Sequence, residues 1–228
     1  MKEVKKIMKI YKHVIWDWNG TLLDDVEIVI EAMNTLLKRR ELPLLNYQTY
    51  RNIFTFPVRD YYMQLGFNFT VEPFEKLATE YIAELNSDKY CFKLFAEAEK
   101  VLSHILNMGV SQSVLSASQE EELNDIVDRF GIKRYFKKVV GLNNHYATSK
   151  VERGKECLID LSLKSEEVIL IGDTIHDYEV ACEIGCDCLI VANGHQSYER
   201  LEKLTVNIVS SLSDVCKLVQ ETTVRGVL

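Results

Sequence analysis

Five short runs rich in β-branched residues set the strongest limit on how this chain can fold. They are YKHVIW (11–16), GVSQSVLS (109–116), FKKVVGL (136–142), EEVILIGD (166–173) and CDCLIVAN (186–193). From the second run onward, segments of helical length separate most of them. This alternation is typical of βαβ units, in which helices cover both faces of a parallel sheet. The sequence therefore predicts an α/β fold built on a parallel sheet.

The long gap between the first two runs contains no convincing buried strand. Its apolar residues recur at helical spacing, and its prolines divide it into several short segments. These residues are Val26, Ile30, Met33 and Leu37, then Phe74, Leu77, Tyr81 and Leu85, with Pro43, Pro57 and Pro73 as the breaks. We expect an inserted all-helical domain at 23–92, and a core domain formed by 1–22 and 93–228. The insertion would lie over the carboxyl ends of the strands, where open parallel sheets bind ligands.

Charge and hydropathy exclude several classes of partner. The 228 residues carry 34 acids against 27 bases, a formal net charge of -7, whereas surfaces that bind nucleic acids or anionic membranes need clustered bases. We therefore expect neither of those partners, although a small phosphorylated metabolite needs only one or two local cations. No signal peptide or long apolar run is visible, so we expect a cytoplasmic protein. The oligomeric state stays open.

Three cysteines cluster near the fifth run: Cys182, Cys186 and Cys188. A metal or redox site is one interpretation. No CxxC pair or nearby histidine completes a zinc site, so we favour small buried side chains on a helix and the strand after it.

Polar residues follow the ends of several predicted strands. They are Asp17, Ser116, a lysine at 150 or 155, and the acids of GDTIHD at 172–177. The carboxyl ends of parallel strands lie at one edge of the sheet, so these residues can converge on a single crevice. That convergence carries more weight than any one motif.

The chemistry of these residues indicates phosphoryl transfer. A carboxylate such as Asp17 is a competent nucleophile, and Thr21 after Gly20 can orient an anion. Asp173 and Asp177 would repel Asp17 unless a cation lies among them, and Mg²⁺ prefers such oxygen ligands.

Ser116 and a lysine are the expected phosphate-binding residues. Ser116 precedes a predicted helix start, where Ser118 and Glu121 fit a capping box, and backbone N–H groups at a helix start bind anions. Lys150 is preferred to Lys155 because it lies nearer the preceding loop.

DWNGTLLDD, Ser116, Lys150 and GDTIHD, in that order with a helical insertion after the first motif, resemble the haloacid dehalogenase superfamily, in particular its phosphoglycolate phosphatase-like branch. The resemblance covers essentially the whole chain. It implies a Rossmann-like core with a mobile helical cap, and Mg²⁺-dependent hydrolysis of phosphate esters. By motif position, Asp17 would be the nucleophile and a metal ligand, and Asn19 would offer the metal its backbone carbonyl. Thr21, Ser116 and Lys150 would bind phosphate, and Asp173 and Asp177 would complete the metal site.

Asn19 departs from the pattern, because phosphatases of this family usually have a second aspartate there. An amide can neither protonate a leaving alcohol nor activate water, a loss of roughly 10²–10⁴-fold in rate. The favoured hypothesis is a slow or specialised phosphatase in which substrate, water or His176 handles the proton, although a solvated helix histidine is the simpler interpretation of His176. Alternatives are a phosphotransfer or phosphate-sensing protein with little turnover and, less favoured, a dehalogenase. An engineered Asp-to-Asn change is also compatible with the sequence.

The aromatic and basic stretch at 47–62 leaves the substrate open. Arg51 and Arg59 could bind a second anionic group of the substrate. Alternatively the arginines are solvated and the rings of this stretch form the core of the cap, namely Tyr50, Phe54, Phe56 and Tyr61.

Overall fold

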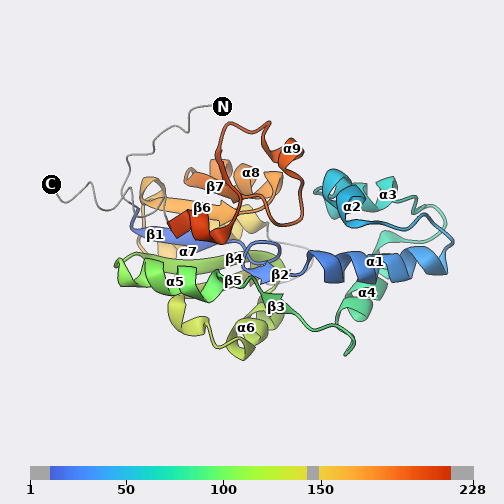
Figure 1. Ribbon diagram of the computed structural model, residues 1–228, viewed down its shortest axis with the longest axis horizontal. Helices are drawn as coiled ribbons and strands as arrows, with labels where there is room; N and C mark the ends of the chain where they lie inside the picture. The colour runs from blue at the N-terminus through green and yellow to red at the C-terminus, as the bar shows by residue number, and fades with distance from the viewer. Residues whose placement is uncertain (1–10, 143–148, 217–228) are drawn as a thin grey trace.

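The computed structural model describes residues 11–142 and 149–216, and its centre is one six-stranded parallel sheet (Figure 1). The strand order is β5-β4-β1-β6-β7-β8. The strands are β1 (His13–Trp16), β4 (Ser111–Gln119), β5 (Lys138–Leu142), β6 (Val168–Gly172), β7 (Asp187–Val191) and β8 (Asn207–Val209). The predicted α/β fold with a parallel, Rossmann-like sheet is confirmed, and each of the five predicted runs contains a strand of it.

Helices surround this sheet and also form a separate group at one end of the molecule (Figure 1). Those of the sheet region are α5 (Ala98–Asn107), α6 (Glu120–Arg129), α7 (Lys150–Asp160), α8 (Ile175–Ile184) and α9 (Tyr198–Leu201), with short 3-10 turns η1 (Lys133–Tyr135) and η2 (Ser165–Glu167). The separate group is α1 (Val26–Arg39), α2 (Tyr47–Ile53), α3 (Val58–Gln64) and α4 (Phe74–Leu85).

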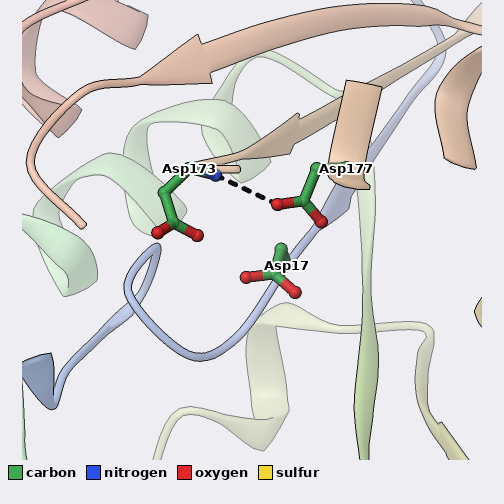
Figure 2. A group of neighbouring side chains, drawn as sticks. All are labelled: Asp17, Asp173 and Asp177. Atoms are coloured by element: carbon green, nitrogen blue, oxygen red, sulfur yellow. Dashed lines mark hydrogen bonds between the residues drawn. The ribbon is translucent and has the colours of Figure 1, made fainter. Parts of the chain in front are cut away.

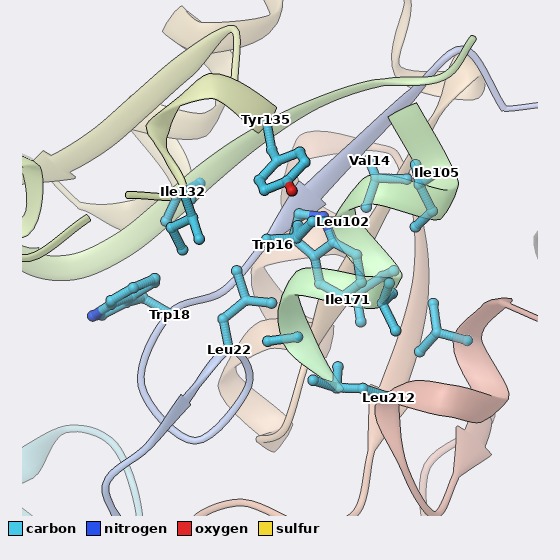
Figure 3. Packing of buried hydrophobic residues seen from close by; sticks show 14 of the residues in the cluster. Val14, Trp16, Trp18, Leu22, Leu102, Ile105, Ile132, Tyr135, Ile171 and Leu212 are labelled. Atoms are coloured by element: carbon cyan, nitrogen blue, oxygen red, sulfur yellow. The ribbon is translucent and has the colours of Figure 1, made fainter. Parts of the chain in front are cut away.

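Alternate side chains of β1 enter two different hydrophobic clusters, one on each face of the sheet. Val14 and Trp16 belong to the cluster shown in Figure 3, into which α5 brings Leu102 and Ile105. Ile15 belongs to the second cluster, to which α7 and α8 contribute. Because successive side chains of a strand point to opposite faces, a strand buried on both faces reads as the continuous apolar run seen in the sequence.

The inserted helices have a hydrophobic cluster of their own. Its buried members all come from α1 to α4 and the turns between them, from Val26 to Leu77. Where the chain enters and leaves this region, β2 (Leu23–Asp24) pairs antiparallel with β3 (Lys93–Leu94). This two-stranded connection, which the sequence did not predict, lies beside the expected domain boundaries. We keep 23–92 for the cap and 1–22 with 93–228 for the core as a proposal.

The expected helix start at Ser118 and its capping box with Glu121 are wrong. β4 continues to Gln119, which pairs with Leu142 of β5, and α6 begins at Glu120 without a side-chain cap. The Ser118 hydroxyl instead donates to the side chain of Asn19 at 3.0 Å. A partner from a distant part of the chain has therefore replaced a local one.

None of the helices in the described ranges combines the length and the apolar character that a membrane crossing requires.

Candidate active site

Asp17 follows β1 directly, and its side chain lies in a buried polar environment. Its backbone N–H donates to Ile171 of β6, which continues the sheet pairing by one residue. One carboxylate oxygen accepts from Lys150 Nζ at 2.5 Å, and the other accepts from Thr21 Oγ1 at 3.1 Å. The sheet and both partners thus fix the position of this carboxylate, which is only 7% exposed.

Asp177 is held by the first turn of α8. One of its oxygens accepts from the backbone N–H and the hydroxyl of Thr174, in a capping box that starts the helix. The other accepts from Lys150 Nζ at 2.6 Å. An acid in the first turn of an exposed helix would otherwise face the solvent. The capping box holds Asp177 toward the sheet edge instead.

Asp173 directly follows β6 and faces Asp17 (Figure 2). Its carboxylate accepts from Thr21 Oγ1 at 3.2 Å and from the backbone N–H of His195 at 2.5 Å. Its own backbone N–H donates to Asp177 at 3.2 Å, the bond drawn in Figure 2.

The three carboxylates converge (Figure 2), with one oxygen of each lying within 4.8 Å of the others. Burial and the neighbouring carboxylates raise the pKa of Asp17 and of Asp173 above the ordinary range. Although burial opposes it, the ion pair with Lys150 lowers the pKa of Asp177. Buried oxygens with too little positive charge around them are a donor set that fits a hard divalent cation.

Lys150 is the cation that faces these acids. It is 6% exposed, and its contacts with Asp17 and Asp177 raise its pKa despite burial. Lys155, the alternative from the sequence, is exposed on the outer side of α7. Lys150 therefore lies in the site and Lys155 does not.

Asn19 lies between an acceptor and a donor. Its Nδ2 donates to Asp25 at 2.7 Å, and its Oδ1 accepts from Ser118 at 3.0 Å. Ser118 Oγ in turn lies 3.1 Å from the hydroxyl of Ser116, which is buried at the same sheet edge. The structure therefore brings all seven predicted site residues to one place, together with Asp25 and Ser118, to which the sequence analysis gave no role in the site.

His195 is a further residue that sequence reasoning missed. Its Nε2 lies 3.3 Å from Asp25, and its Nδ1 is within 2.8 Å of the hydroxyl of Tyr50 in α2. Although burial opposes it, Asp25 raises the pKa of His195 to about 9. The available signal was its place: His195 follows β7, so it lies at the same sheet edge as the other strand-end residues.

The simpler interpretation of His176, a solvated helix histidine, is wrong. Its ring stacks on Phe56 of the cap, with centroids 4.6 Å apart, and burial lowers its pKa. A ring from the cap covers this position, which no local pattern in α8 could indicate.

Neither Arg51 nor Arg59 of the cap faces the acids. Arg51 donates to the backbone carbonyls of Ala192, Gly194 and Gln196, in the loop after β7. Arg59 lies over the ring of Phe69, 4.6 Å from its centroid. The expectation that these arginines are free to bind a substrate anion is therefore wrong, and so is the expectation that Arg51 is merely solvated. Tyr50, Phe54 and Tyr61 do belong to the packed interior of the cap, whereas Phe56 stacks on His176 of the core domain.

A cavity of about 290 Å³ lies between the acids and the cap. At the core end it is lined by the residues described above. At the cap end it is lined by rings and aliphatic side chains of α1 to α4 and of the α2–α3 turn. This volume is near the lower limit for small-molecule sites.

Comparison with known proteins gives a match over most of the chain. A family model described as haloacid dehalogenase-like hydrolase matches residues 14–191. The sequence is 23% identical over 207 residues to the tyrosine-protein kinase PtkA of Mycobacterium tuberculosis, which is 90% of this chain and 70% of that protein.

Solved structures share the fold. That of M. tuberculosis PtkA has a TM-score of 0.78 at 21% identity, over 92% of this chain and 98% of that one. A predicted phosphatase from Clostridium acetobutylicum has a TM-score of 0.77 at 23% identity, over 93% and 100%. A predicted phosphoglycolate phosphatase from Haemophilus somnus has a TM-score of 0.73 at 16% identity, over 92% and 98%.

Proposed function

The chain belongs to the haloacid dehalogenase-like hydrolase family, and from that premise we propose that it is a Mg²⁺-dependent phosphatase acting on a small phosphate monoester. The observation that carries the proposal is the buried carboxylate of Asp17, which lines the cavity and is held by Lys150 and Thr21. Similar structures described as phosphatases support it.

Asp17 is the proposed nucleophile. One of its oxygens attacks phosphorus, the ester P–O bond breaks, and the leaving oxygen takes the bonding electrons. Water then attacks the aspartyl-phosphate, which releases phosphate and restores the carboxylate. Lys150, Ser116 and Thr21 bind the phosphoryl oxygens, and the charge of Lys150 offsets the charge that develops on them.

The carboxylates of Asp17, Asp173 and Asp177, with the backbone carbonyl of Asn19, are the proposed Mg²⁺ ligands. Bound there, the ion would supply positive charge that shields the phosphate from the three acids. The fit rests on the donor set, since these buried oxygens lie within 4.8 Å of one another.

Asn19 predicts slow turnover. Its amide is occupied by Asp25 and Ser118, and it does not titrate, so leaving-group protonation and water activation fall to solvent, substrate or His176, which lines the cavity. The loss of an acid–base residue is worth roughly 10²–10⁴-fold. The product would still be inorganic phosphate.

Phosphotransfer is the second candidate. If water attacks the aspartyl-phosphate slowly, another acceptor can compete for the phosphoryl group. The amide at position 19 favours this reading, and so does the likeness to a protein named as a tyrosine kinase. A phosphate-sensing role with little turnover would use the same site. Dehalogenation is less supported, because attack on carbon gives no role to the paired acids Asp173 and Asp177.

A small phosphorylated metabolite as the partner and a cytoplasmic location belong to this proposal, as does the absence of nucleic-acid and membrane partners.

The test is an assay of phosphate release from a panel of small esters, with Mg²⁺ and with a chelator. We expect slow, Mg²⁺-dependent release by the natural protein. Asp17→Asn keeps the shape of the nucleophile and should abolish release. Lys150→Ala should lower kcat/KM at least about 10²-fold, as expected for loss of a group that stabilises developing charge, whereas the matched variant Lys155→Ala should not.

Three outcomes separate the candidates. Release that is equal in the Asp17→Asn variant contradicts the proposal. An acyl-phosphate on Asp17 that is detected by mass and persists in water, with little free phosphate, favours phosphotransfer. Halide release from a haloacid without Mg²⁺ favours the dehalogenase.

A further inference from the structure

The cavity has two chemically different ends. The core end presents carboxylates, hydroxyls and Lys150, which suit a phosphoryl group. The cap end presents aromatic rings, among them Phe54, Phe56, Tyr61 and Tyr62. Aliphatic side chains line this end as well, so whatever is esterified to the phosphate must lie among rings and apolar chains.

No lysine or arginine from the described part of the cap lines this end of the cavity. Arg51 is bound to backbone carbonyls and Arg59 lies over Phe69. Arg39 and Arg40 pair with glutamates of the cap, at 2.6 and 2.7 Å. A second anionic group on the substrate would thus be buried without a lysine or arginine partner from the cap, and the ring nitrogens of His195 already contact Asp25 and Tyr50, so its burial is unfavourable. The cavity disfavours carboxylated or doubly phosphorylated esters.

The rings at the cap end favour an aromatic guest over an aliphatic one. Phe54 packs edge-on against Phe56 and Tyr61, with centroids 5.4 and 5.3 Å apart. A guest ring can add to such an array, and aromatic pairs gain stability beyond the area that they bury. An apolar cavity of about 150 Å³ accepts benzene, so about 290 Å³ holds one ring and a phosphoryl group.

Tyr61 marks where a polar substituent on that ring would bind. The residue is 2% exposed and lines the cavity, and its hydroxyl makes no hydrogen bond with any described residue. Buried polar groups nearly always have a partner, so a ligand hydroxyl or carbonyl within reach of it would be bound.

Asn19 supports the same conclusion from the chemistry of bond cleavage. A leaving alkoxide needs a proton, because the pKa of an alkanol is close to that of water, about 15.7. A phenolate leaves as the anion far more readily, because the pKa of a phenol is about 10. An enzyme without an acid at position 19 is therefore best matched to aryl esters.

Resting on the phosphatase function proposed above, we infer that the substrate is an aryl phosphate monoester whose ring packs against Phe54 and Phe56 and whose polar substituent contacts Tyr61. In the first step Asp17 Oδ bonds to phosphorus and the aryl P–O bond breaks. The phenolate departs with the bonding pair and takes its proton from solvent. In the second step water oxygen bonds to phosphorus, the acyl P–O bond breaks, and a water proton passes to solvent.

Four substrates test the inference on the natural protein with Mg²⁺: phenyl phosphate, benzyl phosphate, cyclohexyl phosphate and phosphoglycolate. We expect kcat/KM for phenyl phosphate to exceed that for phosphoglycolate by about 10²-fold or more, since the latter brings a carboxylate and an alkoxide leaving group. Benzyl phosphate keeps the ring but leaves as an alkoxide, so its KM should resemble that of phenyl phosphate while its kcat is lower. Cyclohexyl phosphate also leaves as an alkoxide but has no aromatic ring, so its KM should be higher than that of benzyl phosphate.

The Tyr61 contact is tested with phenyl phosphates that carry one ortho, meta or para hydroxyl. For at least one of them, Tyr61→Phe should lower the ratio of its kcat/KM to that of phenyl phosphate by about five- to tenfold, the effect of one hydrogen bond to a buried group. Tyr198→Phe, which removes an exposed hydroxyl outside the cavity, should leave this ratio unchanged.

The outcomes distinguish this inference from the function beneath it. Turnover of phosphoglycolate equal to or better than that of phenyl phosphate overturns the aryl inference and leaves the phosphatase standing. Equal kcat for benzyl and phenyl phosphate overturns the leaving-group argument. Absence of Asp17-dependent turnover with all four esters overturns the phosphatase function, and the aryl inference with it.

Discussion

At the residue scale, each polar atom of the Asn19 amide has a hydrogen-bond partner of the right kind. Asp25 accepts its N–H at 2.7 Å, and Ser118 donates to its carbonyl oxygen at 3.0 Å. A carboxylate at position 19 would face the carboxylate of Asp25 at hydrogen-bond distance. The environment therefore fits an amide better than a carboxylate.

The Asn19→Asp variant should be less stable at neutral pH by about 1–3 kcal/mol, because two carboxylates in contact raise the pKa of at least one of them. A carboxyl whose pKa is raised by folding is tolerated best when protonated, so the loss should shrink as the pH falls. Urea unfolding at several pH values measures this. If the stability loss does not depend on pH, the carboxylate contact is not its cause.

Asp25→Asn is the matched second change, because an amide at position 25 can donate to a carboxylate at position 19. A double-mutant cycle with Asn19→Asp should give a favourable coupling energy of about 1–2 kcal/mol. The double variant should also release phosphate faster than the natural protein, since position 19 then titrates. Additive stability changes would contradict the pairing.

Gly20 is needed for space as well as for backbone conformation. Its φ is +71°, and a Cβ there would lie 2.5 Å from both Asp173 and the ring of His195. Gly109 has a similar φ of +77°, but a Cβ there would meet nothing within 4 Å. Comparing alanine variants at these two positions therefore separates the cost of a left-handed backbone conformation from the cost of a steric clash.

Gly20→Ala should therefore cost more than Gly109→Ala, which pays only the cost of a left-handed alanine, about 1–2 kcal/mol. Gly20→Ala must also displace Asp173, so phosphate release should fall sharply while Gly109→Ala retains it. Equal effects of the two variants on stability and activity would rule out the close approach of Gly20 to Asp173.

At the scale of elements, α2 is joined to the loop after β7. Arg51 donates to three carbonyls of that loop, and the backbone N–H of Ser197 donates back to the Arg51 carbonyl at 3.1 Å. The three bonds from the side chain depend on the fork shape of the guanidinium, which a lysine cannot reproduce. They hold the cap over the acids, with Tyr50 against His195.

Arg51→Ala should destabilise the protein by about 1–3 kcal/mol because it leaves partly buried carbonyls unpaired. The KM for a phosphate ester should rise, since the cap is held less firmly. Hydrogen exchange at residues 192–197 and chemical denaturation report the two effects. Arg39→Ala, which removes exposed ion pairs in the same cap, should change stability much less than Arg51→Ala and leave the exchange of that loop unchanged.

At the scale of the whole molecule, folding buries three neighbouring carboxylates whose negative charge the protein's own cations do not fully offset. Burial raises the pKa of Asp173 from 3.8 to about 8. A carboxyl of this kind binds its proton more tightly when folded, so stability falls as the pH rises between the unfolded and folded pKa values. Asp25 raises the pKa of His195 from 6.5 to about 9, which has the same consequence for stability. The stabilisation by protonated His195 is complete below pH 6.5 and is lost as the pH rises through about 9.

In chelator, the protein should therefore lose stability between about pH 4 and 9, on the order of a few kcal/mol. Mg²⁺ should raise the melting temperature most at the upper end of this range, because it binds the ionised acids. Asp173→Asn should flatten the pH profile and remove most of the Mg²⁺ effect. Asp128→Asn, a change at an exposed acid, should do neither, and a profile that is flat in the natural protein would contradict the account.

The sheet was predictable because its strands are buried on both faces and read as continuous apolar runs. The helices of the cap were predictable from spacing and prolines. The strands that were missed are short: β8 has three residues, and β2 and β3 have two each. Pairs of that length leave no periodic pattern, so only their partners define them.

The sequence by itself indicated that Asp17, Ser116, Asp173 and Asp177 would meet, with a lysine at 150 or 155, because the carboxyl ends of parallel strands share one edge of a sheet. Tertiary structure alone decided which groups surround them. Ser118, His195 and Arg51 act through partners far away in the chain, and Asp25 joins Asn19, six residues before it, to the distant His195. Such contacts follow from packing and not from local spacing. For the same reason Asn19, an exception in its motif, becomes in three dimensions one half of a matched pair.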